Sequence, residues 1–417
     1  MAQRIALQDI CKIYDGPHAT PTKTIDGPIY LGIDAITEDG KLDSSQFAHL
    51  SEADYLKWTK RVTPQYGDIV FSYEATLGRY ALIPEEFYGC LGRRLAVIRN
   101  TSLDVDTTWL YYYFRSPEWT NFIQSKIVKG STVNRLSIED FPSYTIPKVP
   151  IESQKRIAHI LSCIDKKIHD NDAVNDNLEH QLQDIYNYWF TQFDFPDVNG
   201  QPYKSSGGAM VWNEQLKRKI PANWQLKQLS EVCAFRNGIN YDKDVAGDKT
   251  YRIINVRNIS SSTTLLSEDE LDEIILPQKH ADKYCVAAES IIIARSGIPG
   301  ATRILYRPSA NTIFCGFIIC GTPTESNMQY YLMLLLKQLE GSSATQTGGS
   351  ILKNVSQDTL GDLLVPIPPK DVLAAFNHQA IQALDLIHNN LNESVNLRKL
   401  RDWLLPMLMN GQATVSD

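Results

Sequence analysis

The chain has 417 residues, a formal net charge of −7 at pH 7, and 43% hydrophobic and 21% charged residues. This length exceeds one ordinary domain and the composition excludes a wholly disordered chain, so we expect two or three folded domains. No apolar run approaches the roughly eighteen residues that span a bilayer, and the segment from Met1 to Ala6 lacks the apolar core of a signal peptide, so we expect a soluble, cytoplasmic protein.

The first 150 residues combine short strands with short helices. Turn residues bound three runs that are predicted to be strands, namely Pro28–Ile36, Asp68–Tyr73 and Leu95–Arg99. Two helices are predicted at Thr107–Phe114 and Pro117–Ser125, the second beginning at a proline, which a first helical turn tolerates. A polar loop, Lys129–Arg135, and a proline-punctuated extended segment, Phe141–Pro150, follow. Residues 1–150 are therefore predicted to form a mixed α+β domain.

Residues 151–192 are predicted to form a long helix, because neither proline nor glycine occurs from Ile151 to Phe190. Within it, mainly apolar residues recur in alternating steps of four and three, which is typical of a coiled-coil seam. The seam positions are Ile157, Leu161, Ile164, Ile168, Asn171, Asn175, Leu178, Leu182, Ile185 and Trp189. A linker rich in Gly, Pro and Ser follows at residues 193–224.

After the linker the chain repeats itself. Leu7 and Gly16 correspond to Leu229 and Gly238 at a spacing of 222 residues, and the run Leu95–Ile98 corresponds to Phe317–Cys320 at the same spacing. From Gly130 and Gly349 onward the spacing is 219 residues, which one three-residue deletion explains. We therefore predict a second domain at residues 225–370 and a second long helix at residues 371–411. The copies agree better in apolar pattern than in polar identity, so they share a fold more than a binding surface.

The two long helices are predicted to pair. The second seam consists of Phe376, Ala380, Ala383, Ile387, Asn390, Ser394, Leu397, Arg401, Leu404 and Leu408. Each helix would be roughly 50 Å long, more than its own domain can cover, and pairing hides both seams. A pseudo-two-fold relation between the copies would make the pair antiparallel, with Ala380 and Ala383 allowing close approach and the polar positions fixing the register. The alternative is two unrelated amphipathic helices, each packed on its own domain.

No constellation of catalytic residues is evident. The chain lacks a phosphate-binding Gly-x-x-x-x-Gly-Lys-Ser/Thr loop, a Gly-x-Gly-x-x-Gly turn and His-x-x-x-His spacing. The seven cysteines are scattered without a Cys-x-x-Cys pair, so we expect most of them to be buried apolar residues and not zinc ligands or disulfides. The chain is therefore predicted not to be an enzyme.

Polar, glycine-containing loops at equivalent places in the two copies are candidates for binding. Arg and Lys reach phosphates or guanine edges, Asn and Gln pair with adenine edges, and Ser and Thr contact phosphate oxygens. The net negative charge argues mildly against a free-standing nucleic-acid binder, without excluding a local basic face. Ordinary solvated loops are the alternative for each loop taken singly.

The candidate DNA-binding residues of the first copy are Tyr73, Thr76, Arg79, Arg93, Arg94, Lys129, Ser131, Thr132, Asn134 and Arg135. Those of the second copy are Arg295, Ser296, Thr345, Gln346, Thr347, Ser350, Lys353 and Asn354. A third pair of loops lies at Asp15–Thr20 and Arg236–Asn240. Arg93 and Arg94 replace Cys315 and Gly316 of the other copy, so they are candidates for contacts peculiar to the first domain, with a surface ion pair as the alternative.

These features together resemble the specificity subunit of a type I restriction-modification system. The resemblance covers essentially the whole chain, and particular stretches strengthen it: Phe195–Gly208, Ile220–Trp224, Asp15–His18 and Leu404–Gly411. It implies two target-recognition domains, each recognising half of a bipartite, asymmetric DNA sequence, and paired helices that set the distance between the half-sites.

The resemblance also implies partners and cofactors. Two methyltransferase subunits would dock on the helices, and motor-nuclease subunits could join them. S-adenosylmethionine, ATP and Mg would then be bound by those partners and no cofactor by this chain. Two alternatives from other classes are a protein-binding scaffold and a DNA-modifying enzyme that acts alone.

Overall fold

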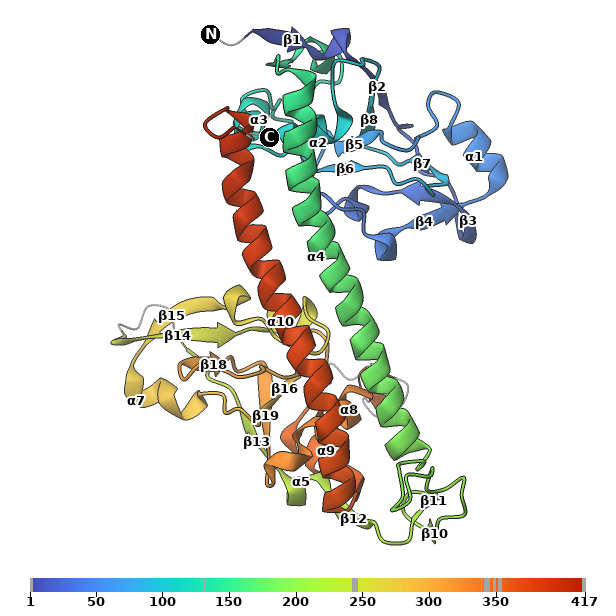
Figure 1. Ribbon diagram of the computed structural model, residues 1–417, viewed down its shortest axis with the longest axis vertical. Coiled ribbons are helices and arrows are strands. Elements are labelled where there is room, and N and C mark those ends of the chain that lie inside the picture. Colours follow the sequence, from blue (N-terminus) through green and yellow to red (C-terminus); the bar gives the residue numbers. More distant parts are fainter. Residues whose placement is uncertain are drawn as a thin grey trace. The chain divides into compact units, whose positions relative to one another are not determined.

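The computed structural model describes residues 3–130, 133–241, 247–338, 340, 346–347, 350–351 and 355–414 (Figure 1). The chain divides into two compact units. Unit 1 comprises Met1–Lys167 with Leu397–Asp417, and unit 2 comprises Ile168–Asn396. Each unit therefore contains one domain of the repeat and parts of both long helices.

Unit 1 contains three small sheets. The largest is antiparallel, with strands in the order β2 (Cys11–Asp15), β8 (Leu95–Asn100), β5 (Ile69–Ser72) and β6 (Tyr80–Leu82). A second sheet has the order β4 (Ala48–Leu50), β3 (Lys23–Leu31) and β7 (Gly89–Leu91), and its β3 and β7 are parallel. The outermost strands, β1 (Arg4–Ala6) and β9 (Thr145–Pro147), pair with each other. The helices are α1 (Glu52–Trp58), α2 (Thr107–Phe114) and α3 (Pro117–Gln124).

The sequence explains the two predicted helices of this domain, which are confirmed. The Asp106 side chain accepts a hydrogen bond from the Trp109 amide and caps α2, and Ser116 caps α3 in the same way. The first predicted strand is displaced, because Ile33–Ala35 forms a short 3₁₀ turn and the strand instead begins at Lys23.

The core of unit 1 is unusually aromatic. The α2 helix buries most of its side chains, and the Trp119 indole of α3 donates a hydrogen bond to the Tyr80 hydroxyl at 2.8 Å. Phe71 of β5 stacks on both Tyr80 and Phe141. The strand end that follows Phe71 therefore starts from a rigid, well-packed base.

Unit 2 repeats the three sheets in the same strand order. The four-stranded sheet has the order β13 (Cys233–Asn237), β19 (Ile318–Pro323), β16 (Ile291–Ala294) and β17 (Thr302–Arg303). The three-stranded sheet has the order β15 (Asp272–Leu276), β14 (Lys249–Ile254) and β18 (Thr312–Phe314). The two-stranded sheet pairs β12 (Gln225–Gln228) with β22 (Leu364–Ile367). Two hairpins are added, β10 (Met210–Asn213) with β11 (Arg218–Pro221), and β20 (Gln346–Thr347) with β21 (Ser350–Ile351). The helices are α5 (Leu229–Val232), α6 (Val256–Ser260), α7 (Gln278–Ala281), α8 (Gln329–Gln338) and α9 (Gln357–Gly361). The internal repeat is therefore confirmed at the level of topology.

One correspondence drawn from the sequence is wrong by a single residue. The amide of Gly16 donates to the Leu95 carbonyl, and the equivalent Gly238 donates to Ile318, not to Phe317. Phe317 lies outside β19 and is 63% exposed. Two apolar runs can be aligned with a shift of one residue and still match in sequence. In a sheet, however, a shift of one residue in strand register would turn every side chain to the other face. Arg93 and Arg94 therefore correspond to Gly316 and Phe317.

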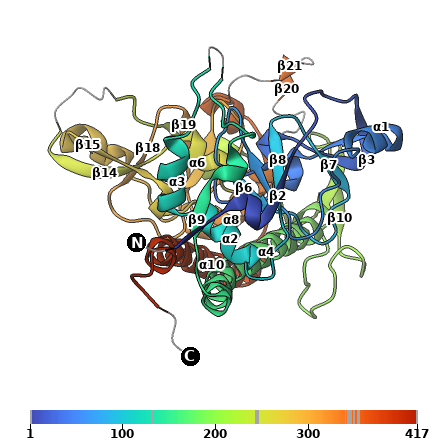
Figure 2. The same cartoon turned by 90° about the horizontal axis from the view of Figure 1, so that it is seen from above.

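The long helices are α4 (Ile151–Tyr186), which ends in a π-helical turn at Asn187–Thr191, and α10 (Lys370–Met409). Figure 2 shows them side by side, and the contacts within each unit make them antiparallel. In unit 2, Asn171 contacts Ser394, and Asn390 contacts Asn175. The described part of the chain contains no helix that is both long and apolar enough to cross a membrane.

The polar seam positions are hydrogen-bonded, and all of them except the half-buried Asn390 are buried. Asn171 is 3% exposed, and its Nδ2 donates to Ser394 Oγ at 3.3 Å and to Glu393 Oε2 at 2.9 Å. Asn390 Nδ2 donates to Asn175 Oδ1 at 2.9 Å. One seam assignment is corrected, because Leu384 is buried whereas Ala383 is half-buried. Since buried amides favour the one alignment in which they find polar partners on the other helix, these contacts fix the register of the pair.

The thiols give a simple test of this burial pattern. All seven cysteines are free; Cys163 on α4 is exposed and Cys285 is half-buried, and the others are buried. Burial raises the pKa of the Cys11, Cys90 and Cys233 thiols to about 12, so they stay protonated and unreactive at pH 8. We expect one rapidly modified thiol in the native protein, lost in Cys163→Ser, and all seven after denaturation. Any rapidly modified thiol in native Cys163→Ser would contradict the packing.

Candidate nucleic-acid interface

In the first domain, a tight loop follows the end of β5. The Gly78 amide donates to the Ser72 carbonyl at 3.1 Å, and the Ser72 hydroxyl donates to the Thr76 carbonyl. Ala75 adopts a positive φ of 62°, which is sparsely populated for a residue with a Cβ. Such backbone conformations concentrate at functional sites, where the surrounding structure holds them in place.

Three segments that are distant in sequence meet at this loop. The Tyr73 amide donates to the Arg94 carbonyl at 3.2 Å, and the Leu136 amide donates to the Tyr73 carbonyl at 2.8 Å. The Ala75 amide donates to the Asn134 carbonyl at 3.3 Å. We call this meeting of residues 72–79, 92–95 and 133–136 the first junction. It brings together most of the candidate residues of the first domain.

The second domain builds the same arrangement. The Arg295 amide donates to the Phe317 carbonyl at 2.9 Å, and the Val355 amide donates to the Arg295 carbonyl at 2.9 Å. The Gly300 amide donates to the Ala294 carbonyl at 2.9 Å, as Gly78 does to Ser72 in the first domain. We call this meeting of residues 294–300, 315–317 and 355 the second junction.

The candidate side chains of the first domain differ in exposure. Arg93, Lys129, Asn134 and Arg135 are exposed, whereas Thr76, Arg79 and Arg94 are half-buried. The Arg79 guanidinium donates hydrogen bonds to the Ile36 carbonyl at 3.1 Å and to the Glu38 carboxylate at 3.0 Å. The contacts therefore leave Arg93, Lys129, Asn134 and Arg135 as the most accessible members of the set.

Arg295 and Ser296 are half-buried in the second junction. Thr345, Lys353 and Asn354, like Ser131 and Thr132 of the first domain, lie outside the described residues. Gln346, Thr347 and Ser350 lie on the β20–β21 hairpin, of which the structure describes only the backbone. These loop predictions stay predictions.

Tyr73 is the most buried candidate, at 4% exposure, and its hydroxyl has no hydrogen-bond partner among the described residues. Burial raises the pKa of Tyr73 to about 12, assisted by the carboxylates of Asp15 and Glu74 and opposed by Arg61 and Arg93. Asp15, from the third candidate loop, forms an ion pair with Arg61. The first junction therefore combines charges of both signs around one uncharged hydroxyl, which can donate or accept a hydrogen bond.

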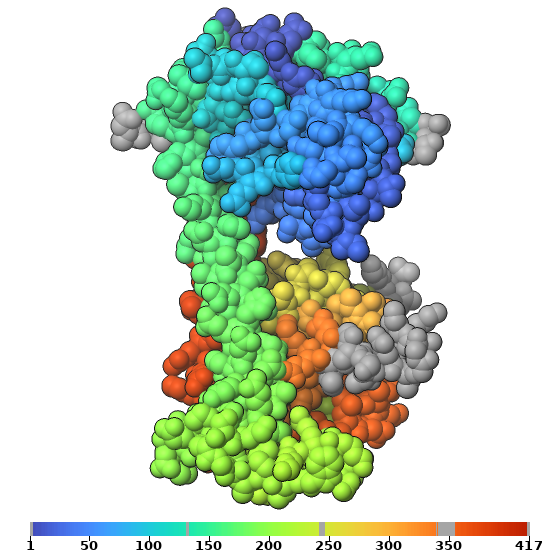
Figure 3. All heavy atoms as spheres, turned by 90° about the vertical axis from the view of Figure 1, so that its right-hand side faces the viewer, coloured from blue at the N-terminus to red at the C-terminus, as the bar shows by residue number. Residues whose placement is uncertain are grey.

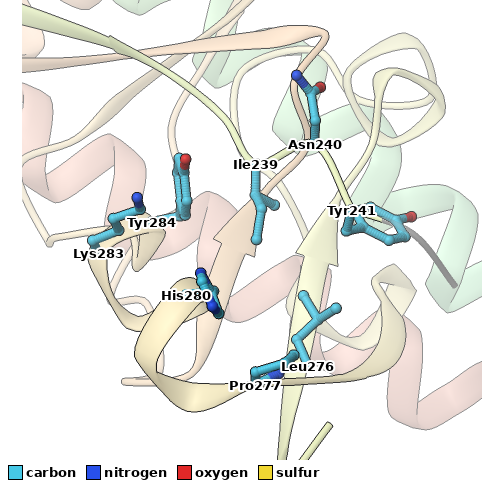
Figure 4. Close-up of a pocket in the computed structure, with 8 residues that line it drawn as sticks. All are labelled: Ile239, Asn240, Tyr241, Leu276, Pro277, His280, Lys283 and Tyr284. Carbon is cyan, nitrogen blue, oxygen red and sulfur yellow. The ribbon is translucent and has the colours of Figure 1, made fainter. Parts of the chain in front are cut away.

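A hollow of about 290 Å³ lies in unit 2 beside the third loop of the second domain (Figure 4). Its walls are Ile239, Asn240, Tyr241, Leu276, Pro277, His280, Lys283 and Tyr284. Asn240 links it to the second junction, because a side chain at Gly316 would collide with the Asn240 amide oxygen. The absence of a side chain at Gly316 thus leaves room for the Asn240 amide.

No cluster of three or more His, Cys, Asp or Glu side chains suited to a metal ion occurs in the described ranges. Separately, the two junctions present hydrogen-bond donors, acceptors and aromatic surface on loops held by sheets, which suits recognition.

Sequence reasoning missed two residues of the junctions. Glu74 was not among the candidates, although its Oε2 lies 3.4 Å from Arg94 Nε. Phe317 was assigned to a core strand because it begins an apolar run. The signal that could have separated it is the preceding Gly316, which marks a turn before the strand.

The long helices carry exposed apolar side chains. On the face of α4 shown in Figure 3 the helix surface is uncovered along much of its length, and Val174 is 44% exposed. On α10, Leu400 and Trp403 are 43% and 58% exposed. A tryptophan exposed to this degree next to another apolar residue is typical of a protein-binding surface.

Comparisons with known proteins agree with these features. The family model described as the type I restriction modification DNA specificity domain matches twice, at residues 3–180 and 221–397. The MjaIX specificity subunit of Methanocaldococcus jannaschii is 25% identical over 86% of this chain and 80% of that protein. The HindI specificity subunit of Haemophilus influenzae is 20% identical over 89% of this chain and 93% of that protein.

A solved structure shares the fold. The S subunit of the type I restriction-modification system from M. genitalium superposes with a TM-score of 0.55 at 15% identity, covering 97% of this chain and 95% of that one. The duplicated domain, the two long helices and the two family matches lead to one conclusion. The chain belongs to the family of type I restriction-modification specificity subunits, the non-catalytic components that recognise DNA.

Proposed function

We propose that this chain recognises a bipartite, asymmetric DNA target, with one half-site for each domain, and recruits two methyltransferase subunits to it. The observation that carries the proposal is the construction of the two junctions. Equivalent backbone hydrogen bonds shape both of them, at Tyr73 and Arg94 in one and at Arg295 and Phe317 in the other. One scaffold that presents different side chains is suited to two different half-sites.

The helix pair supports a fixed spacing between the half-sites. The buried contacts of Asn171 and Asn175 with α10 specify one register, and a helix pair in one register is stiff where a flexible linker would allow many distances. Half-sites on one face of B-DNA recur about every 34 Å. A rigid spacer can therefore select one gap.

The exposed apolar residues of the helices support recruitment of partners. Leu400 and Trp403 lie one helical turn apart on α10, so their side chains share a face. Interface residues that contribute most to binding are enriched in tryptophan. We propose this face as part of a methyltransferase-docking surface, and we propose that motor-nuclease subunits join the complex through those partners.

The chemistry would then belong to the partners. We propose that S-adenosylmethionine, ATP and Mg are bound by the methyltransferase and motor-nuclease subunits and that this chain binds none of them. Its own residues position the DNA and the partners.

The test is reconstitution with the methyltransferase encoded in the same host. With S-adenosylmethionine and genomic DNA, the full chain plus methyltransferase should methylate adenine at one bipartite sequence. Either component alone should give no sequence-specific methylation.

Two results would contradict the proposal. Methylation by this chain alone would indicate an enzyme, and unchanged methyltransferase specificity after addition of the chain would indicate a scaffold without a role in recognition.

A further inference from the structure

The two junctions contain the same kinds of side chain in exchanged positions. In the first, the residue at the end of the central strand is Tyr73 and the loop residue bonded to it is Arg94. In the second, the strand-end residue is Arg295 and the loop residue bonded to it is Phe317. Each junction thus holds one arginine and one aromatic ring on the same backbone contact, in opposite order.

The surroundings of the arginine differ accordingly. Arg94 adopts a positive φ of 72° and its Nε lies 3.4 Å from Glu74 Oε2. Arg295 donates from Nη1 to the Gly316 carbonyl at 3.1 Å. The buried Nε atoms of both Arg94 and Arg295 have no hydrogen-bond partner among the described residues. Both guanidinium groups are therefore oriented by the protein on one side, and neither contact uses all five of an arginine's donors.

The aromatic partner changes from buried to exposed with the exchange. Tyr73 is 4% exposed under the first junction, whereas Phe317 is 63% exposed at the second. An exposed phenylalanine on a loop has no packing role that explains it. On a DNA-binding face it can contact the methyl group of thymine.

We propose that Arg94 and Arg295 are the specificity-determining residues of the first and second half-sites, each recognising a guanine through O6 and N7. This inference rests on the proposed function and adds which residues distinguish the half-sites. A guanidinium matches the two acceptors of guanine in a bidentate geometry. Because the exchange moves the guanidinium from loop to strand end, the guanine lies at different places in the two half-sites.

The charge pattern at the first junction favours a base over a phosphate as the ligand of Arg94. Glu74 lies beside the guanidinium, and its carboxylate would repel a phosphate that approached the same point. The same carboxylate can accept a hydrogen bond from the N4 amino group of cytosine. An Arg–Glu pair therefore suits the edge of a G·C pair.

The test is the methylation motif of a host that carries the methyltransferase with variants of the full chain. In Arg94→Gln, preference for guanine should fall roughly 10- to 100-fold at one position of one half-site, with the other half-site unchanged. Arg295→Gln should have the same effect in the other half-site. Arg94→Lys and Arg295→Lys keep the positive charge but lack the planar guanidinium that makes two parallel hydrogen bonds. If a glutamine variant does not accumulate, the lysine variant at that position should show the fall in preference for guanine instead.

The matched control is Arg4→Gln. Arg4 also pairs with a glutamate in the first domain, Glu118 at 3.1 Å, and its side chain is 41% exposed. The motif should be unchanged in this variant. If methylation in the Arg94 and Arg295 variants fell equally at all sites and the motif stayed the same, the inference would be overturned. A wild-type host without any bipartite motif would instead refute the proposed function itself.

Discussion

Replacing Asp165 with leucine is expected to lower the free energy of unfolding of unit 1 by about 3 kcal/mol, because buried Arg401 loses its half-buried partner and, of its two carboxylate partners, keeps only the exposed Asp402. Arg401 is 7% exposed, and its Nη1 donates to Asp165 Oδ1 at 2.8 Å. The Tyr112 hydroxyl donates to the same carboxylate at 2.7 Å. Thermal unfolding followed by circular dichroism would report the loss as an earlier first transition.

The repeat supplies a matched control for this prediction. In unit 2 the positions equivalent to Asp165 and Arg401 are Leu384 and Leu182, which are both buried in the core. The double variant Asp165→Leu/Arg401→Leu recreates that apolar pair and should recover most of the lost stability, since apolar replacements of buried ion pairs are often neutral. A double variant less stable than Asp165→Leu would show that the ion pair is not the cause.

Removing Asn171–Val174 from α4 together with Asn390–Glu393 from α10 is expected to change the gap between the half-sites without altering either half-site. The paired deletion leaves Asn175 to take the place of Asn171 opposite Ser394, so the polar contact of the seam can re-form. Each helix shortens by about 6 Å, which corresponds to fewer than two base pairs along B-DNA. Mapping methylated sites in a host that carries this variant would measure the new gap.

A matched variant separates spacing from general damage. Asn171→Ala/Asn390→Ala removes polar contacts of the seam but keeps the lengths of both helices, so the gap should stay the same even if stability falls. If the paired deletion left the original gap unchanged, the helix pair would not be what sets it.

The sequence predicts the architecture well because the fold depends on features that a repeat exposes. The apolar pattern of each strand and the spacing of Asn171 and Asn390 recur in both copies, and their structural counterparts form equivalent sheets and one antiparallel helix pair. Packing requires only that such positions be apolar or have a hydrogen-bond partner. The periodicity of apolar residues in the sequence is therefore enough to find them.

The junctions could be predicted only in part. The candidate loops do meet, yet no sequence pattern shows that Tyr73 bonds to Arg94 or that Arg295 bonds to Phe317. That contact depends on the register of β8 and β19. An apolar run does not determine this register to better than one residue. The error concealed Phe317 and paired Arg94 with Gly316. Side-chain exposure and backbone register decide such details, and both arise from tertiary packing.

The most direct test of the central claim is methylome sequencing of the host with the gene intact and with it deleted. The intact strain should show methylated adenines in one two-part sequence with a constant gap, and deletion should abolish that methylation completely. Persistence of the same motif after deletion, or a motif with a single continuous part in the intact strain, would contradict recognition of two half-sites by this chain.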